Sequence, residues 1–246
     1  MCGFLGEVSF TNKVSERSKF IQSSKLLSHR GPDYSNYYIN KNIGIAHNRL
    51  SIIDLSENAN QPFISKDERF CLSYNGEIYN YLELKKILKN NGFKFYSSSD
   101  TEVVLNSLIH WGDKALDKFN GMFSFILYDK YLNEITLARD RYGIKPLYYY
   151  NSPTLTAFAS EQKAILNLDN FNKTLDYEAL YEYFTFQNIL TDKTLEKNIK
   201  NFPPGNIAKF KISLNEFKIR QYWDYNFNNS KVIKYEDALH ELKYLF

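Results

Sequence analysis

The segment that follows Cys2 places the strongest constraint on the fold. Gly3 to Phe10 is apolar and ends in an alternation of apolar and polar residues, which predicts a strand buried on at least one face. Cys2 is therefore expected at the start of a buried strand. An initiator methionine is normally trimmed before a small residue, which would leave Cys2 with both a thiol and a free α-amine. Such an amine has an ordinary pKa of about 7.7 to 8, so one residue could supply a nucleophile and its base. The alternative is a cysteine without a role at this position.

The remaining pattern groups strands together and clusters helices between them. Helices are predicted from Ser15, from Asn80 as N-cap with Glu83 three residues on, after Asp100, at 177–184 and at 235–246. Strands are predicted at 37–39, 43–46, 72–76, 123–128, 135–137, 147–150, 155–159, 207–210 and 217–222. The first two form a hairpin around 40–42. Hairpin-length connections between strands favour an α+β layered domain over an alternating βαβ sheet.

Composition excludes several classes of function. The chain has 246 residues, 43% of them apolar, and the net charge of +3 comes from 31 basic and 28 acidic residues that are interspersed along the chain. This pattern lacks the basic run of a nucleic-acid-binding surface. No apolar stretch approaches the roughly 18 residues of a membrane span. Two cysteines, Cys2 and Cys71, without a secretory signal indicate a reduced, cytoplasmic protein.

A set of short strings occurs in a recognisable order. The strings are Cys2-Gly3, His29-Arg30-Gly31-Pro32-Asp33, 47–54, 74–80, 99–102, 121–125, 139–147, 158–161 and 203–205. Their arrangement resembles the glutaminase domain of glutamine-dependent asparagine synthetases, which are class II glutamine amidotransferases with an N-terminal nucleophile. The Arg-Leu-Ser-Ile-Ile-Asp string at 49–54 favours the asparagine synthetase branch. The resemblance implies a four-layer αββα sandwich of two antiparallel sheets flanked by helices.

The resemblance also implies a reaction. Cys2 would attack the side-chain amide of glutamine, release ammonia and leave a glutamyl thioester that water hydrolyses to glutamate. The side-chain amide of Asn75 and the backbone N–H of Gly76 match the pair that stabilises the developing oxyanion. An isolated Asn-Gly pair is more often a turn, and that alternative remains open at this point.

Further matched positions concern the glutamine substrate. Arg49 is the residue type that binds a carboxylate with two parallel hydrogen bonds, and Asp100 matches the position that receives the α-ammonium. Glu77 matches a residue of the same pocket, and Leu50 and Ile52 match positions that offer backbone groups. The structural alternatives are an ion pair for Arg49 and a helix cap for Asp100.

Three other reactive side chains are assigned no catalytic role. His29 and His47 are interpreted as structural histidines, because the resemblance requires no histidine base. Cys71 lies in a strand pattern among apolar neighbours and is interpreted as an inert core thiol.

The resemblance implies that an activating half lies outside these residues. No Gly-Gly pair and no Gly-x-x-x-x-Gly-Lys loop occurs in the sequence, so we expect no metal and no cofactor in this chain, with ATP and Mg²⁺ confined to a synthetase domain. We predict a glutaminase domain at 1–210 and a connecting segment at 211–246. The last helix carries an apolar stripe that a following domain or a partner would cover: Ala238, Leu239, Leu242, Leu245 and Phe246.

Alternatives remain for the role of the whole chain. It could be a fragment, a partner of a separate synthetase chain or a remnant, and a homodimer is also open. The ammonia acceptor could be aspartate or a related carboxylic acid such as a sugar acid. The rival function is a non-catalytic glutamine-binding or regulatory partner of a synthetase chain.

Overall fold

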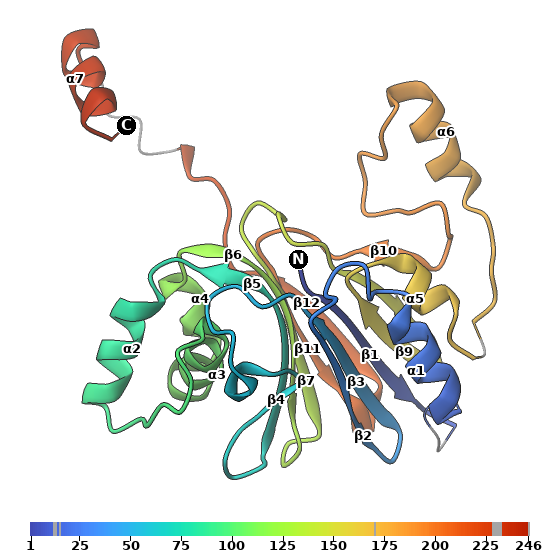
Figure 1. The fold of residues 1–246 in the computed structure, drawn as a ribbon. Helices are drawn as coiled ribbons and strands as arrows, with labels where there is room; N and C mark the ends of the chain where they lie inside the picture. The colour runs from blue at the N-terminus through green and yellow to red at the C-terminus, as the bar shows by residue number, and fades with distance from the viewer. Residues whose placement is uncertain (12–13, 15, 170, 228–232, 246) are drawn as a thin grey trace.

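Two six-stranded antiparallel sheets lie face to face in the computed structural model, which describes residues 1–11, 14, 16–169, 171–227 and 233–245 (Figure 1). The first sheet has the order β10-β8-β9-β1-β3-β2. Its strands are β10 (Ile199–Asn201), β8 (Tyr148–Asn151), β9 (Leu155–Ala159), β1 (Gly3–Ser9), β3 (Ile43–Arg49) and β2 (Tyr34–Asn40). All seven residues of β1 are buried, which confirms the strand predicted after Cys2.

The second sheet has the order β12-β11-β7-β6-β5-β4. Its strands are β12 (Glu216–Gln221), β11 (Asn206–Lys211), β7 (Glu134–Arg139), β6 (Gly121–Asp129), β5 (Phe70–Ile78) and β4 (Phe63–Ile64). Asn75 and Gly76 lie inside β5, opposite Ser124 and Phe123 of β6. The interpretation of this pair as a turn is therefore wrong.

Helices cover the outer face of each sheet (Figure 1). On the first sheet lie α1 (Arg17–Lys25) and α5 (Gln162–Leu166), and on the second lie α2 (Tyr81–Asn90), α3 (Asp100–Trp111) and α4 (Ala115–Lys118). Short 3-10 turns occur at Glu57–Ala59, Gly112–Lys114 and Ile212–Leu214. The order helix, sheet, sheet, helix confirms the predicted αββα sandwich.

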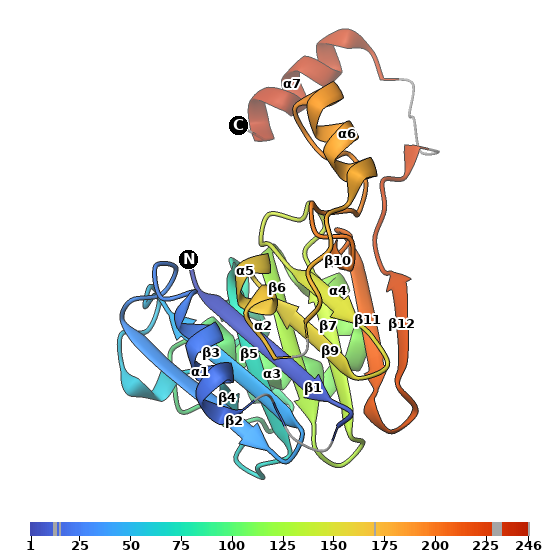
Figure 2. The same cartoon turned by 90° about the vertical axis from the view of Figure 1, so that its right-hand side faces the viewer.

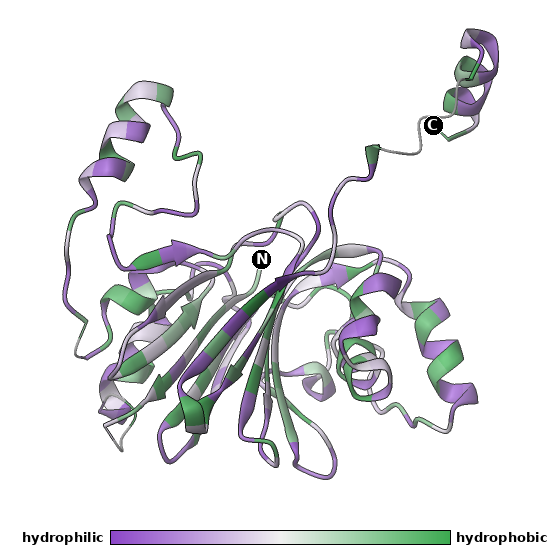
Figure 3. Ribbon diagram, turned by 180° about the vertical axis from the view of Figure 1, so that it is seen from behind, coloured by the Kyte–Doolittle hydropathy of each residue, from purple (hydrophilic) through white to green (hydrophobic). Residues whose placement is uncertain are grey.

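Three buried clusters fill the three spaces between these four layers. Successive side chains of a strand point to opposite faces, so Phe4 packs between the two sheets while Leu5 packs under α1. In β5, Cys71 faces the first sheet and Leu72 faces the helices. Figure 3 shows the resulting mixture of hydrophobic and hydrophilic residues along the strands. These alternations determine which side chains can meet between the sheets.

Two predicted helix caps differ in the structure. Asn80 precedes α2, but its side chain makes no cap bond and instead accepts from the Asn120 N–H at 3.0 Å and donates to the Lys118 carbonyl at 2.9 Å. Ser99 caps α3 by accepting from the Thr101 N–H at 3.1 Å. Asp100 is thus the first residue of the helix, and its carboxylate is used elsewhere. Ser15, the predicted start of the first helix, lies outside the described residues.

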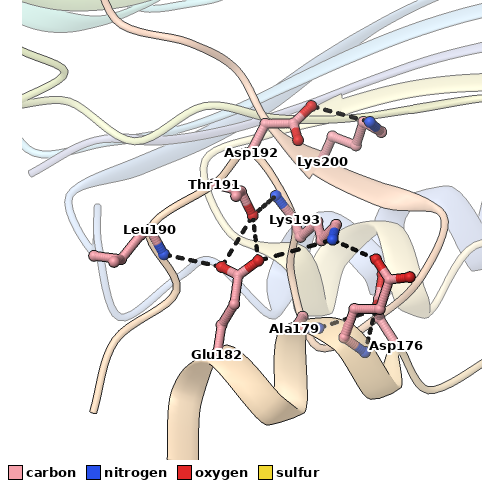
Figure 4. Close-up of polar contacts among 9 residues, drawn as sticks. Asp176, Ala179, Glu182, Leu190, Thr191, Asp192, Lys193 and Lys200 are labelled. Carbon is pink, nitrogen blue, oxygen red and sulfur yellow. Dashed lines mark hydrogen bonds and ion pairs between the residues drawn. The ribbon is translucent and has the colours of Figure 1, made fainter. Parts of the chain in front are cut away.

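Helix α6 (Tyr177–Phe186) stands away from the sheets (Figures 1 and 2). It is held by polar contacts to the loop that follows it (Figure 4). Asp176 accepts from the first backbone N–H groups of the helix, and Glu182 accepts from the Leu190 N–H at 3.1 Å and from the Thr191 hydroxyl. The ammonium of Lys193 lies 2.5 Å from the Glu178 carboxylate. Only Ala179 of this helix is buried.

Helix α7 (Tyr235–Leu245) has no buried residue, so the four described residues of its predicted apolar stripe are not covered. Phe246, the fifth, lies outside the described residues. Within the described ranges, no helix has the length and apolar character needed to cross a membrane. The boundary predicted after residue 210 stays a prediction.

Candidate active site

The strand register brings three of the predicted residues to one end of the space between the sheets. Gly3 pairs with Asn48, so Cys2 stands beside Arg49 at the end of β3. Nδ1 of His47 lies 2.8 Å from the hydroxyl of Ser73, a contact that joins the two sheets. Because side chains alternate along a strand, Arg49 and Asn75, each two residues further on, share those inner faces.

Cys2 lies against the backbone of Leu50. The sulfur accepts from the Leu50 N–H at 3.4 Å and lies 3.6 Å from the Leu50 carbonyl oxygen. The carbonyl oxygen of Cys2 accepts from Nε of Arg30 at 2.9 Å. Burial raises the pKa of the thiol, and the Leu50 N–H together with nearby positive charges opposes that rise. Both the N–H and the carbonyl of Leu50 therefore belong to the site, because both contact the Cys2 sulfur.

Asn75 is buried with a donor that has no partner. The residue is 1% exposed, and its Nδ2 makes no hydrogen bond to any residue that the structure describes. A buried amide without a partner costs about 1–3 kcal/mol, so such a group is rare without a use. The next residue must be glycine, because a Cβ at Gly76 would lie 2.4 Å from the Met122 carbonyl oxygen.

The guanidinium of Arg49 is held by neutral oxygens. It donates to the Ser56 carbonyl at 2.9 Å, to Oδ1 of Asn60 at 2.7 Å and to the carbonyl of Asp54. No carboxylate pairs with it within the described part of the chain. Arg49 is thus oriented by its neighbours while its charge is not neutralised, and the ion-pair alternative is wrong for the described residues.

Asp100 is 4% exposed and receives three hydrogen bonds. Its Oδ2 accepts from the Tyr74 hydroxyl at 2.8 Å and from the Ile78 N–H at 3.0 Å, and Oδ1 accepts from the Ser99 hydroxyl at 3.4 Å. Burial raises the pKa of this carboxyl, although these hydrogen bonds favour the charged form. A positively charged partner would stabilise the charged form of this buried carboxyl.

One small pocket joins most of these groups. The predicted residues that line it are Cys2, Arg49, Ile52, Gly76, Glu77 and Asp100. Leu50 and Asn75 do not line it, although Leu50 contacts the Cys2 thiol and Asn75 precedes Gly76 on β5. A larger groove, lined by residues that include Phe63, Phe93 and Tyr96, contains none of the predicted residues.

The three residues that were interpreted as structural, His29, His47 and Cys71, do not line the pocket. His29 binds Glu161 at 2.9 Å on the outside of the first sheet. Burial lowers the pKa of His47 to about 3, so this imidazole is neutral at physiological pH. Burial raises the pKa of Cys71 to about 12, which makes it an inert thiol.

Sequence reasoning missed several members of the site. Gln61 and Tyr74 line the pocket, and Tyr74 holds Asp100. Lys145 is 4% exposed, and its positive charge opposes the rise in the pKa of the Cys2 thiol. The available signal was a lysine between Ile144 and Pro146 within one of the matched strings. Among the described residues, no group of three or more His, Cys, Asp or Glu side chains could hold a metal ion.

An αββα sandwich in which the first strand directly follows a half-buried cysteine has the architecture of an N-terminal-nucleophile type of domain. More particularly, the chain belongs to the glutamine amidotransferase domain family, the model of which matches residues 1–223. It is a glutamine amidotransferase domain of the asparagine synthetase type.

Curated relatives carry the name glutamine-hydrolysing asparagine synthetase. Asparagine synthetase 1 of Bacillus subtilis is 38% identical over 209 residues, which are 84% of this chain and 33% of that protein. A putative asparagine synthetase 2 of Methanocaldococcus jannaschii is 34% identical over 244 residues, 91% of this chain and 47% of that protein. The chain thus spans between a third and a half of the length of these two relatives.

A solved structure supports the fold alone. The Bacillus subtilis glutamine phosphoribosylpyrophosphate amidotransferase, in complex with ADP and GMP, matches with a TM-score of 0.65 at 18% identity. The match covers 91% of this chain and 50% of that chain.

Proposed function

We propose that this domain hydrolyses the side-chain amide of glutamine to glutamate and ammonia through a glutamyl thioester on Cys2. The thiol attacks the amide carbon, the C–N bond breaks, and ammonia leaves with the proton that the α-amine took from sulfur. Water then attacks the thioester carbon, which releases glutamate and returns the thiol. The proposal requires removal of Met1, because only a free Cys2 amine can act as the base.

The observation that carries the proposal is the unpartnered Nδ2 of Asn75. This donor and the Gly76 N–H follow one another on β5, beside the pocket that holds Cys2. Both donors are fixed before substrate arrives, so they stabilise a developing oxyanion without reorganisation. The missing hydrogen bond of Asn75 is then made to the reacting oxygen of glutamine.

Other residues of the pocket support binding of the glutamine backbone. The uncompensated guanidinium of Arg49 suits the α-carboxylate, because arginine can form two parallel hydrogen bonds to a carboxylate. The buried carboxylate of Asp100 suits the α-ammonium. Glu77 and Ile52 also line the pocket. When Arg49 and Asp100 bind the α-carboxylate and the α-ammonium of glutamine, the side-chain amide of the substrate is directed toward Cys2.

We further propose that the ammonia serves amidation of aspartate or a related carboxylic acid by a synthetase domain or a separate synthetase chain. The names and lengths of the relatives support this role. ATP and Mg²⁺ would act there rather than in this chain. Both cysteines are free thiols, which agrees with a reducing, cytoplasmic location.

The test measures glutamate and ammonia release from glutamine by the purified chain, with its N-terminus established by intact mass. The Met1-trimmed chain is expected to release both products, Cys2→Ala neither, and the matched control Cys71→Ala both. Glutamine binding without release by trimmed protein would contradict the proposal and favour the non-catalytic regulatory role.

A further inference from the structure

The larger groove lies at the edge of the second sheet, beside strand β4. Its volume is about 570 Å³, which is within the range of small-molecule sites in proteins. The walls come from β4, from the segment that follows α2 and from α3. Their apolar surface is supplied by Phe63, Ile64, Phe93, Tyr96 and Leu105. The groove therefore has the size and the apolar walls to hold the ring system of a small molecule.

The charged groups of the groove favour an anion. Lys66 and Lys94 line it, and both are exposed. The ammonium of Lys66 lies 3.1 Å from the centre of the Tyr96 ring, so a cation and an aromatic face adjoin in the wall. Among the described lining residues the acidic one is Glu102, which already accepts from the Tyr96 N–H at 3.0 Å and from the Ser97 N–H at 2.8 Å. Both ammonium groups are thus left for a ligand.

Asn60 belongs both to this groove and to the surroundings of Arg49. Its Oδ1 accepts from Nη1 of Arg49 at 2.7 Å, and the residue also lines the groove. A guanidinium has only donors, so the amide oxygen must face Arg49 and the Nδ2 donors must point elsewhere. Nδ2 makes no hydrogen bond to the described part of the chain. An anion in the groove can therefore accept from Nδ2 while Oδ1 stays on Arg49.

The contact with Asn60 also determines how Arg49 is presented to the Cys2 pocket. Both N–H groups of Nη1 are used, one by Asn60 and one by the Ser56 carbonyl at 2.9 Å. Nη2 donates to the carbonyl of Asp54, which leaves its second N–H and that of Nε for a carboxylate. A change at Asn60 therefore acts on the group proposed to bind glutamine.

We infer that the groove is a regulatory site for a small molecule with a planar apolar ring and one anionic group, coupled to the glutamine site through Asn60 and Arg49. The coupling rests on the proposed function, in which Arg49 binds glutamine. An anion on Nδ2 polarises the amide and makes Oδ1 a better acceptor for Arg49. Glutamine on Arg49 in turn holds Asn60 in the orientation that the anion needs. Each ligand therefore strengthens the binding of the other by the same factor.

The experiment is a calorimetric titration of the chain with 2-naphthoate, which has a planar ring and one carboxylate. Wild type binds it, and 2-naphthalenemethanol, with the same ring but no charge, binds about tenfold more weakly. Asn60→Asp keeps an acceptor for Arg49 but replaces the Nδ2 donor by a negative charge, so it weakens 2-naphthoate binding about tenfold. Tyr96→Ala removes an aromatic wall that is 51% exposed and weakens binding about fivefold. The matched control is Tyr181→Ala, at a 75% exposed tyrosine of α6, which leaves the affinity unchanged.

The coupling is measured in Cys2→Ala, which cannot form the thioester. Saturating glutamine tightens 2-naphthoate binding about fivefold, and saturating 2-naphthoate tightens glutamine binding by the same factor. Asn60→Ala, which lacks the contact with Arg49, removes this mutual effect.

The results that overturn the inference are distinct from those that overturn the proposed function. Absence of 2-naphthoate binding, binding that Asn60→Asp and Tyr96→Ala leave unchanged, or an affinity that bound glutamine does not alter overturns the inference. Coupling in a chain that releases no glutamate would support it and contradict the proposed function alone. If glutamine does not bind, Arg49→Lys still tests the link, because a weaker 2-naphthoate affinity supports it and an unchanged affinity overturns it.

Discussion

The hydroxyl of Tyr74 donates a 2.8 Å hydrogen bond to the carboxylate of Asp100 and so joins strand β5 to the first residue of helix α3. Tyr74 faces the helices, and Asn75, the next residue, faces the opposite sheet. One strand therefore positions the site proposed for the glutamine ammonium with one residue and the oxyanion donor with the next. The pleat of β5 directs these two side chains to opposite faces of the strand.

Tyr74→Phe removes one of the donors that keep Asp100 charged. The pKa of Asp100, already raised by burial, will rise further, so the carboxylate will be lost at a higher pH as the solution is acidified. We expect the glutamine KM to increase on the acid side, and to begin its increase at a higher pH than in the wild type. A KM profile between pH 5 and 8 checks this. Tyr128→Phe, a buried tyrosine outside the pocket, should leave the profile unchanged.

Asn75→Ala removes the unpartnered amide without breaking a hydrogen bond of the described residues. If the amide stabilises the oxyanion, kcat for glutamine should fall about 10²- to 10³-fold. The free energy of unfolding should change little or increase, because an unsatisfied buried donor is lost. Steady-state kinetics and urea denaturation measure the two effects, with Asn151→Ala at the end of β8 as the control. A small kcat effect would remove Asn75 from the proposed mechanism.

Arg49→Lys replaces the planar fork by a single ammonium. We expect the KM for glutamine to rise about 10- to 100-fold, which corresponds to the loss of one charged hydrogen bond. Glutamine α-amide lacks the carboxylate. Its KM should therefore be high in the wild type and should differ little in the variant. Equal losses for both substrates would instead indicate that Arg49 only orders the loop at Asp54 and Ser56. Arg69→Lys is the matched control, because Arg69 lies just before β5 and pairs with Asp129 outside the pocket.

Glu161 links pH to stability through Arg30, which holds the Cys2 carbonyl. Burial would raise its pKa, but hydrogen bonds from Arg30, Lys163 and His29 outweigh this and lower the pKa to about 2. Its stabilising effect is present above pH 4.5 and is lost as the pH falls toward 2. After allowance for solvent screening, Glu161→Gln should cost about 1–2 kcal/mol at pH 7. Urea denaturation should give converging values for wild type and variant near pH 2, and a difference independent of pH would contradict this origin.

Local patterns were sufficient for most helices and strands, whereas the four αββα layers were predicted from the resemblance to a family. The apolar run after Cys2, the hairpin around 40–42 and the helix stripes each reflect contacts between near neighbours in sequence, and the structure has these elements. The cap assigned to Asn80 was wrong because a distant segment, Lys118 and Asn120, competes for its side chain. Sequence spacing carries no information about such a competitor.

The same distinction between local and long-range information applies to the residues of the site. Strings that resemble a family identified Cys2, Arg49 and Asp100, and the structure brings all three to one pocket. Tyr74 and Lys145 were missed because their surroundings depend on long-range geometry: a hydroxyl that crosses to a helix, and a loop in which the lysine is largely buried. A tyrosine in a strand and a lysine near a turn look ordinary without that geometry.

The most direct test of the account is intact-mass spectrometry of the Met1-trimmed protein, quenched with acid during turnover of glutamine. The account predicts a glutamyl adduct that peptide mapping assigns to Cys2, that hydroxylamine removes and that Cys2→Ala lacks. Slower hydrolysis in Asn75→Ala should still allow the adduct to form, at a reduced rate. Glutamate release without an adduct on Cys2, or release that persists in Cys2→Ala, would contradict the proposed nucleophile.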